Sequence, residues 1–92
     1  MSIPLKMHIA EHVHWRRFDS ELVVLDLDRG EYYGLNEVAA EAFEHVARGE
    51  TFPDTVTGLL QAYDVDRERL ERDLERTFEE LLRRGIFVPD AT

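Results

Sequence analysis

The chain has 92 residues and a mass of 10.8 kDa, which suits a single domain over residues 1–92 and is too short for two. Eleven Lys and Arg against 20 Asp and Glu give a net charge of −9, which argues against nucleic-acid binding because phosphate contacts need clustered cations. The absence of cysteine excludes disulfides, thiolate metal ligands and a cysteine nucleophile. No apolar run approaches the roughly 20 residues of a membrane span, and no signal-peptide core begins the chain. We therefore expect a cytoplasmic protein without membrane contacts.

The first third of the chain has the residue alternation of β-strands. Apolar positions over residues 7–18, which Glu11 interrupts, predict a first and weak strand. Residues 21–27 predict a stronger strand, because aliphatic and β-branched residues favour extended backbone. The turn over residues 28–30 ends on a glycine that is free to adopt positive φ, and residues 31–35 return as a third strand. The sequence thus predicts a β-hairpin here.

Apolar residues at helical spacing predict three helices after the hairpin. The first begins at Asn36, a favoured N-cap residue, and stops at Gly49. A loop over residues 51–54 enters the second helix. The third helix, residues 66–84, is longer and has Asp66 as its expected N-cap, and a short extended segment over residues 86–88 follows it. Strands followed by helices predict an α+β fold, winged-helix-like, with the helices gathered on one face of the sheet.

Histidines are the first candidates for catalysis or metal binding. His8, His12 and His14 lie in one stretch, and we expect His12 and His14 to share a face of the first strand. A metal site also needs third and fourth ligands, which no later segment supplies, because His45 lies in the middle of a helix. The sequence therefore predicts no metal site, and a polar strand near the surface instead.

Other catalytic patterns are equally weak. The two serines lie outside any nucleophile-elbow context, and the five glycines are scattered singly rather than gathered into a phosphate-binding loop. Neighbouring carboxylates are frequent, but a chain with 20 acids produces such pairs by composition alone. On residues 66–84 arginines and acids alternate at i,i+4 spacing, which is typical of a solvated helix face. We expect no catalytic residue and no cofactor.

Adjacent tyrosines on the third strand allow two interpretations. Successive strand residues point to opposite faces, so Tyr33 shares a face with Glu31 and Tyr32 points away from it. Either both rings are partly buried with their hydroxyls reaching water, or the strand and its aromatic side chains receive a peptide. Aromatic residues are enriched at recognition sites because they offer a large contact area with few rotatable bonds.

Three motifs in a fixed order make the pattern more specific. Residues 30–36 read G-x-Y-Y-x-L-N, residues 63–65 read Y-D-V, and residues 81–85 read L-L-x-x-G. With this order and spacing, residues 8–88 resemble a PqqD-like domain, also called a RiPP precursor-peptide recognition element. The resemblance covers nearly the whole chain.

The resemblance implies a three-stranded antiparallel sheet packed on three helices, and a protein that is not an enzyme. Members of this family capture the leader segment of a ribosomally made precursor peptide and present it to a modifying enzyme. The leader adds as a strand to the third strand, here residues 30–35, in the cleft against the third helix. The peptide-binding residues that we expect are Gly30, Glu31, Tyr32, Tyr33, Gly34, Leu35, Asp66, Leu70, Asp73, Leu74 and Thr77. Leu81 and Leu82 are expected to belong to the core instead.

The amino-acid sequence around the hairpin is most similar to those of the discrete leader-binding proteins of lasso-peptide pathways, whose partner is a separate leader peptidase. The nearest competitor is the branch that serves a radical enzyme in pyrroloquinoline-quinone biosynthesis. Two other classes stay open: a winged-helix DNA-binding module, which the seven acids and six arginines of residues 66–84 disfavour, and a dimerisation module. A gel shift at low salt tests the first, and light scattering with and without a leader tests the second.

Overall fold

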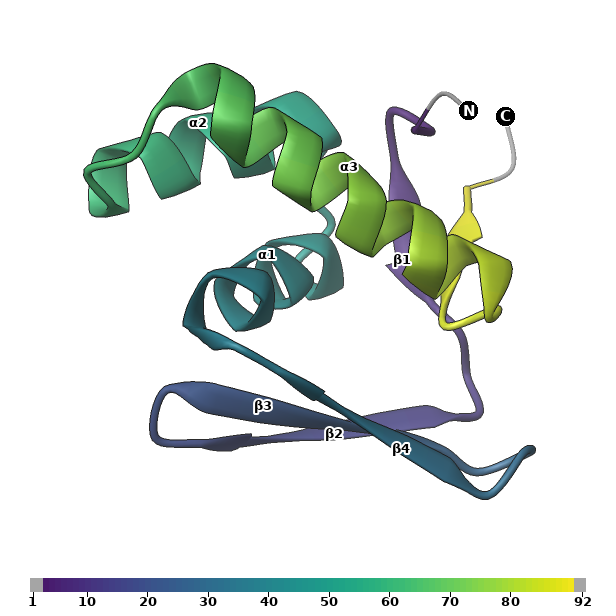
Figure 1. The fold of residues 1–92 in the computed structure, drawn as a ribbon. Helices are drawn as coiled ribbons and strands as arrows, with labels where there is room; N and C mark the ends of the chain where they lie inside the picture. The colour runs from purple at the N-terminus through teal and green to yellow at the C-terminus, as the bar shows by residue number, and fades with distance from the viewer. Residues whose placement is uncertain (1–2, 91–92) are drawn as a thin grey trace.

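Two small sheets and three helices form residues 3–90, the part of the chain that the computed structural model describes (Figure 1). In chain order the elements are β1 (Met7–Ile9), β2 (Val13–Phe18), β3 (Glu21–Asp26), β4 (Glu31–Leu35), α1 (Glu37–Ala47), α2 (Phe52–Ala62), α3 (Arg67–Arg83) and β5 (Phe87–Pro89). The larger sheet is antiparallel with the strand order β2-β3-β4. Its three strands lie on one side of the three helices (Figure 1), as the α+β prediction required.

The expected first strand divides into two strands that belong to different sheets. A turn separates them, in which the Val13 N–H donates to the Ala10 carbonyl at 3.1 Å. Residues before the turn form β1, which pairs with β5 so that His8 lies opposite Val88. Residues after it form β2, which pairs with β3. The single strand over residues 7–18 was therefore a wrong prediction, and the break in alternation at Glu11 marks the turn.

Side-chain caps begin the first and third helices as predicted. Asn36 Oδ1 accepts the Ala39 N–H at 3.0 Å, and Asp66 Oδ2 accepts the Arg69 N–H at 3.2 Å. Each cap satisfies one of the N–H groups that the first turn of a helix leaves without a partner. Both caps line the groove described below, where they fix the starts of α1 and α3.

The second helix begins earlier than predicted. Thr51 is its N-cap and Phe52 its first residue, so most of the predicted loop over residues 51–54 is the first helical turn. Pro53 misled the prediction, although proline is tolerated there because the first N–H groups of a helix have no partner within it.

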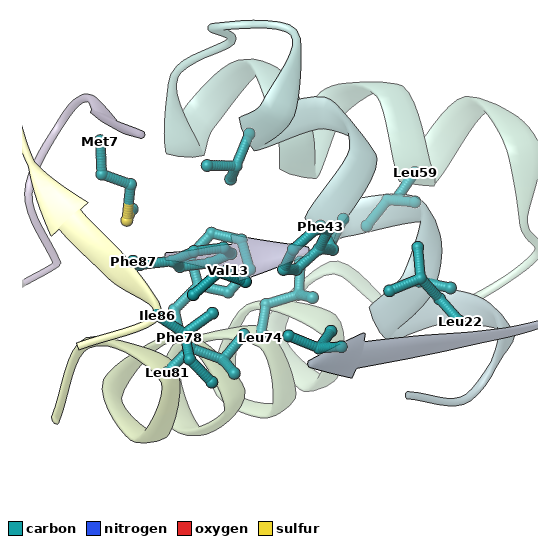
Figure 2. Close-up of a cluster of buried hydrophobic side chains, with 14 of the residues drawn as sticks. Met7, Val13, Leu22, Phe43, Leu59, Leu74, Phe78, Leu81, Ile86 and Phe87 are labelled. Atoms are coloured by element: carbon teal, nitrogen blue, oxygen red, sulfur yellow. The ribbon is translucent and has the colours of Figure 1, made fainter. Parts of the chain in front are cut away.

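Five aromatic rings form an unbroken chain of contacts, with three buried rings between the partly exposed Trp15 and Phe52. Neighbouring centroids lie 5.1 to 5.5 Å apart, and three of the four contacts are edge-to-face, the geometry that ring quadrupoles favour. In order, the rings are Trp15 of β2, Phe43 of α1, Phe87 of β5, Phe78 of α3 and Phe52 of α2. Figure 2 shows the labelled rings of Phe43, Phe78 and Phe87 at its centre. This chain connects both sheets with all three helices.

Strand alternation divides the three-stranded sheet as predicted. Leu22 and Val24 of β3 are fully buried against the helices. Leu25 and Tyr32 lie opposite each other on the outer face, where 40% and 74% of their surfaces are exposed. Tyr33 lies on the inner face, half-buried against the core.

The apolar stripe of α3 does not divide into core and cleft residues as we expected. Leu81 is buried as predicted, but Leu82 is only half-buried. Leu70 and Leu74, which were assigned to the cleft rather than the core, are 5% and 2% exposed and belong to the core as well. The reason is that the floor of the groove is the surface of the core itself.

Among residues 3–90, no helix combines the length and apolar character that crossing a membrane requires.

Replacing Leu81 tests how much the α3–core contact stabilises the fold. Leu81→Ala removes buried methyl groups and leaves a cavity, so the free energy of unfolding should fall by about 2–5 kcal/mol. Urea denaturation monitored by circular dichroism measures the change. Leu27→Ala is the matched control, because Leu27 is 60% exposed and should change stability by less than about 0.5 kcal/mol. Equal losses in the two variants would contradict this picture of the core.

Candidate functional site

One edge of the larger sheet is open. β4 pairs with β3 from Glu31–Asp26 to Leu35–Leu22, and no described strand pairs with its other edge. In an antiparallel edge strand, every second residue points its N–H and C=O groups outward without a strand partner. Such an edge is a template for one more strand.

Two pockets lie along α3, and one of them is lined by Tyr33 and Leu35 of β4. The first, which we call the N-terminal pocket, has a volume of about 480 Å³ and extends along the first half of α3. It is lined by Asn36, Val38, Ala39, Asp64, Val65, Asp66, Arg69, Leu70, Asp73, Leu74 and Thr77. The C-terminal pocket has a volume of about 370 Å³. It is lined by Tyr33, Leu35, Arg76, Thr77, Glu80, Leu81, Arg83 and Arg84. Thr77 lines both pockets, so together they form one groove along α3.

The groove collects most of the expected site residues. Asp66, Leu70, Asp73 and Leu74 line the N-terminal pocket. Tyr33 and Leu35 line the C-terminal pocket, and Thr77 joins the two.

Four expected residues of the strand do not line the groove. Gly30 lies in the turn before β4, and Tyr32 and Gly34 belong to the outer face, because they pair with Leu25 and Val23. Glu31 reaches the groove only through the hydroxyl of Tyr33. These four residues can act on a ligand only through the backbone of the strand, or on its far side.

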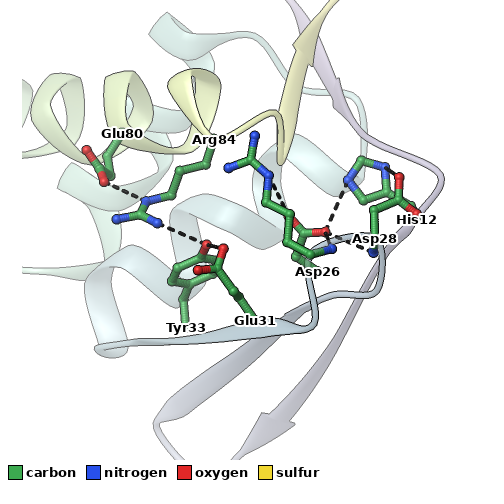
Figure 3. A network of polar contacts seen from close by, with 8 residues as sticks. His12, Asp26, Asp28, Glu31, Tyr33, Glu80 and Arg84 are labelled. Atoms are coloured by element: carbon green, nitrogen blue, oxygen red, sulfur yellow. Dashed lines mark hydrogen bonds and ion pairs between the residues drawn. The ribbon is translucent and has the colours of Figure 1, made fainter.

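A buried carboxylate shapes the turn that leads into β4. Asp26, 1% exposed, accepts the N–H groups of Asp28 and Arg29 through Oδ1, at 3.1 Å each. His12 approaches the same oxygen, with its Nε2 at 3.5 Å (Figure 3). Gly30 completes the turn at φ 66°, a conformation that suits a residue without Cβ. The turn therefore fixes where β4 begins and in which register it runs.

A polar network connects β4 to α3 across the C-terminal pocket. The Tyr33 hydroxyl donates to Glu31 Oε1 at 2.9 Å and accepts from Arg84 Nη1 at 3.0 Å. The Arg84 guanidinium also lies 4.7 Å from the centre of the Tyr33 ring, and its Nε donates to Glu80 Oε1 at 2.6 Å (Figure 3). The hydrogen bond with Glu80, followed by that with Tyr33, raises the pKa of Arg84, and the Arg84 hydrogen bond lowers the pKa of Glu80. This network ties β4 to the end of α3.

The sequence reasoning missed the part of the groove beyond Thr77. Glu80, Leu81 and Arg84 continue the helix face of Thr77 at three-, four- and seven-residue spacing, so helical periodicity could have identified them. Asn36 and Val38 carry no such signal, because they reach the groove through the packing of α1 against α3.

Three of the four histidines contact different carboxylates. His8 Nδ1 lies 2.7 Å from Asp90 Oδ1, and His45 Nδ1 lies 2.8 Å from Glu50 Oε1. The hydrogen bond with His45 is the main cause that lowers the pKa of Glu50. His12 belongs to the turn before β2, so the expectation that it shares a strand face with His14 was wrong. Within residues 3–90, no group of three or more His, Cys, Asp or Glu side chains is placed to hold a metal ion.

Two solved structures share this fold over nearly their whole length. "TbiB1 in Complex with the TbiA(beta) Leader Peptide" matches with a TM-score of 0.83 and 28% sequence identity, covering 92% of this chain and 99% of that chain. "Lasso peptide synthetase B1 complexed with the leader peptide" matches with a TM-score of 0.81 and 27% identity, covering 91% and 99%. Among curated proteins, none matches the sequence.

A family model decides the classification. The model described as coenzyme PQQ synthesis protein D (PqqD) matches residues 21–86, which contain β3, β4 and the three helices. The matched segment thus includes both walls of the groove, and it confirms the resemblance drawn from the three sequence motifs. This chain belongs to the PqqD family.

Proposed function

We propose that this protein is a non-catalytic module that binds the leader segment of a ribosomally made precursor peptide. The leader pairs as an additional strand with β4 and places side chains in the groove along α3. The module then presents the leader to a leader peptidase or another maturation enzyme, in lasso-peptide biosynthesis.

The open edge of β4 beside the groove is the observation that carries this proposal. A peptide strand satisfies the outward N–H and C=O groups of β4, and these main-chain bonds give affinity with little demand on sequence. Alternate side chains of the added strand point toward the helices, where the two pockets can receive them. Backbone pairing and side-chain selection thus come from the same surface.

The similar structures support the same function. Both are described as complexes with a leader peptide, and one is a lasso peptide synthetase component. They match this chain over more than nine-tenths of its length. PqqD-like recognition domains are generally binding modules, which agrees with a groove whose residues are chiefly apolar or paired charged side chains.

The description of the family model supports one alternative. A PqqD-type role would deliver the peptide to a radical enzyme of quinone-cofactor synthesis rather than to a peptidase. Titration calorimetry with each kind of enzyme, in the presence of the leader, separates the two roles. Binding to the peptidase alone supports the lasso-peptide role, and binding to the radical enzyme alone supports the alternative.

Thr77 offers a probe of the groove that spares the core. Thr77 is half-buried and lines both pockets, so Thr77→Ala should leave the melting temperature nearly unchanged. Binding should weaken about three- to tenfold, the scale of one lost hydrogen bond or methyl contact. Fluorescence anisotropy measures the change in affinity, with the labelled leader segment of a candidate precursor peptide as the probe. Thr57→Ala, on the exposed face of α2, is the matched control and should not affect binding. A change in stability alone would remove Thr77 from the site.

Proline substitutions test strand addition. The N–H groups along β4 point alternately toward β3 and toward the open edge. One of the variants Tyr32→Pro and Tyr33→Pro therefore removes a donor from the open edge, and the other removes a hydrogen bond of the ladder with β3. The variant that keeps its melting temperature should lose more than about tenfold in leader affinity. Alanine at the same position should cost less, because strand addition depends on the main chain. Equal effects of proline and alanine would argue against backbone pairing.

The location of binding can be followed residue by residue. When leader is titrated into labelled protein, the amide shifts of residues 31–35 and of residues 66–77 should move together, because the peptide lies between these segments. Heteronuclear correlation spectra measure the shifts. Changes confined to residues 8–14, or to the exposed face of α1, would place the ligand elsewhere and contradict the proposal.

A further inference from the structure

The two ends of the groove carry opposite charge. The N-terminal pocket is lined by three carboxylates, those of Asp64, Asp66 and Asp73, and by the single cation of Arg69. The C-terminal pocket has the reverse balance, with three arginines and the carboxylate of Glu80. This cationic end stands out in a chain whose formal net charge is −9.

Glu80 alone cannot neutralise the arginines at this end. Arg83 Nη2 binds its Oε2 at 2.7 Å and Arg84 Nε binds its Oε1 at 2.6 Å, so one carboxylate is shared by two guanidinium groups. Arg76 is held by Asp73 at 2.8 Å, at the junction of the two pockets. The bonds that Arg83 and Arg84 make within the described part of the chain leave most of their N–H donors available.

The surroundings of these arginines favour a carboxylate ligand. Tyr33, Leu35 and Leu81 form an apolar floor beneath them, and an ion pair beside apolar surface is less screened than one in open water. The side chain of Arg84 is 37% exposed and stacks on Tyr33, so its position is already fixed. A pre-positioned guanidinium can offer two parallel donors to a carboxylate.

We propose that the bound peptide carries an Asp or Glu whose side chain enters the C-terminal pocket, where Arg83 and Arg84 select it. This inference rests on the proposed function and adds a requirement on the leader. In the reverse orientation the peptide would place this acid in the N-terminal pocket, where the carboxylates of that pocket repel it. One acidic residue therefore determines which way along α3 the peptide lies.

Selection from a display library of random dodecapeptides on the immobilised full-length protein tests the inference. Selected peptides that shift the amides of residues 31–35 should share one Asp or Glu at a constant place in their strand. Replacing that acid by its amide should weaken binding about tenfold in wild type. The same replacement should matter less than about twofold in Arg83→Gln, whose side chain is 66% exposed in the structure. Arg72→Gln, on α3 outside both pockets, is the charge-matched control and should retain the tenfold effect.

A variant that is expected to raise the affinity for acidic peptides excludes misfolding as the cause of weaker binding. Glu80→Gln removes the competing carboxylate, so acidic peptides should bind a few-fold more tightly, whereas a damaged fold would bind them more weakly. If peptides bind at β4 with no shared acid, or if the Arg83→Gln and Arg72→Gln variants behave alike, the selection of an acidic residue is wrong while leader binding stands. If no selected peptide shifts residues 31–35, the proposed function fails, and the inference fails with it.

Discussion

The packing of five aromatic rings in one chain is the interaction on which the rest of the structure depends. Trp15 at one end lies on the sheet, Phe52 at the other end lies on α2, and the rings between them come from α1, β5 and α3. Because these rings are bulky and prefer edge-to-face contacts, they set the height of the helices above the sheet. Fully buried aliphatic side chains such as Leu22, Leu59 and Ile86 fill the space around the rings.

The same packing explains why a groove exists beside β4. α3 is anchored through Phe78 to α2 and β5, and β4 is anchored through its ladder with β3. The two elements are thus positioned by different partners. Across the groove, the polar contact between them within residues 3–90 is the network of Tyr33 and Arg84 at one end. Leu70 and Leu74 close the bottom of the space, which is why residues that line the groove are also residues of the core.

An open sheet edge is ordinarily a hazard, since it can pair with any extended chain. In this protein the edge is short, begins with the acidic Glu31 and contains Gly34, features that weaken indiscriminate pairing. The groove adds a second requirement, because a strand that pairs with β4 must also place its side chains between β4 and α3. A surface of this kind can bind through the backbone and still discriminate among peptides.

Local patterns in the sequence determined the elements that depend on interactions between residues close together in the chain. The hairpin follows from residue alternation and from a glycine turn, and the starts of α1 and α3 follow from the caps Asn36 and Asp66. The family follows from motifs within residues 30–85. The resemblance drawn from these motifs also led to Thr77, which lines both pockets, but not to the residues that continue its helix face. The sequence misplaced the start of α2, where a capping threonine and a proline resemble a loop.

Tertiary structure alone decided the features that join distant residues. β1 separates from β2 because its partner, β5, lies about 80 positions away, as in the pairing of His8 with Val88. Arg84 meets Tyr33 across 51 positions, and this contact gives the groove its cationic end. Neither pairing leaves a periodic signal, since its energy comes from side chains and backbone groups that only the packed core brings together. The sequence by itself thus determined which strand and which helix form the walls, and the fold decided how they are spaced and charged.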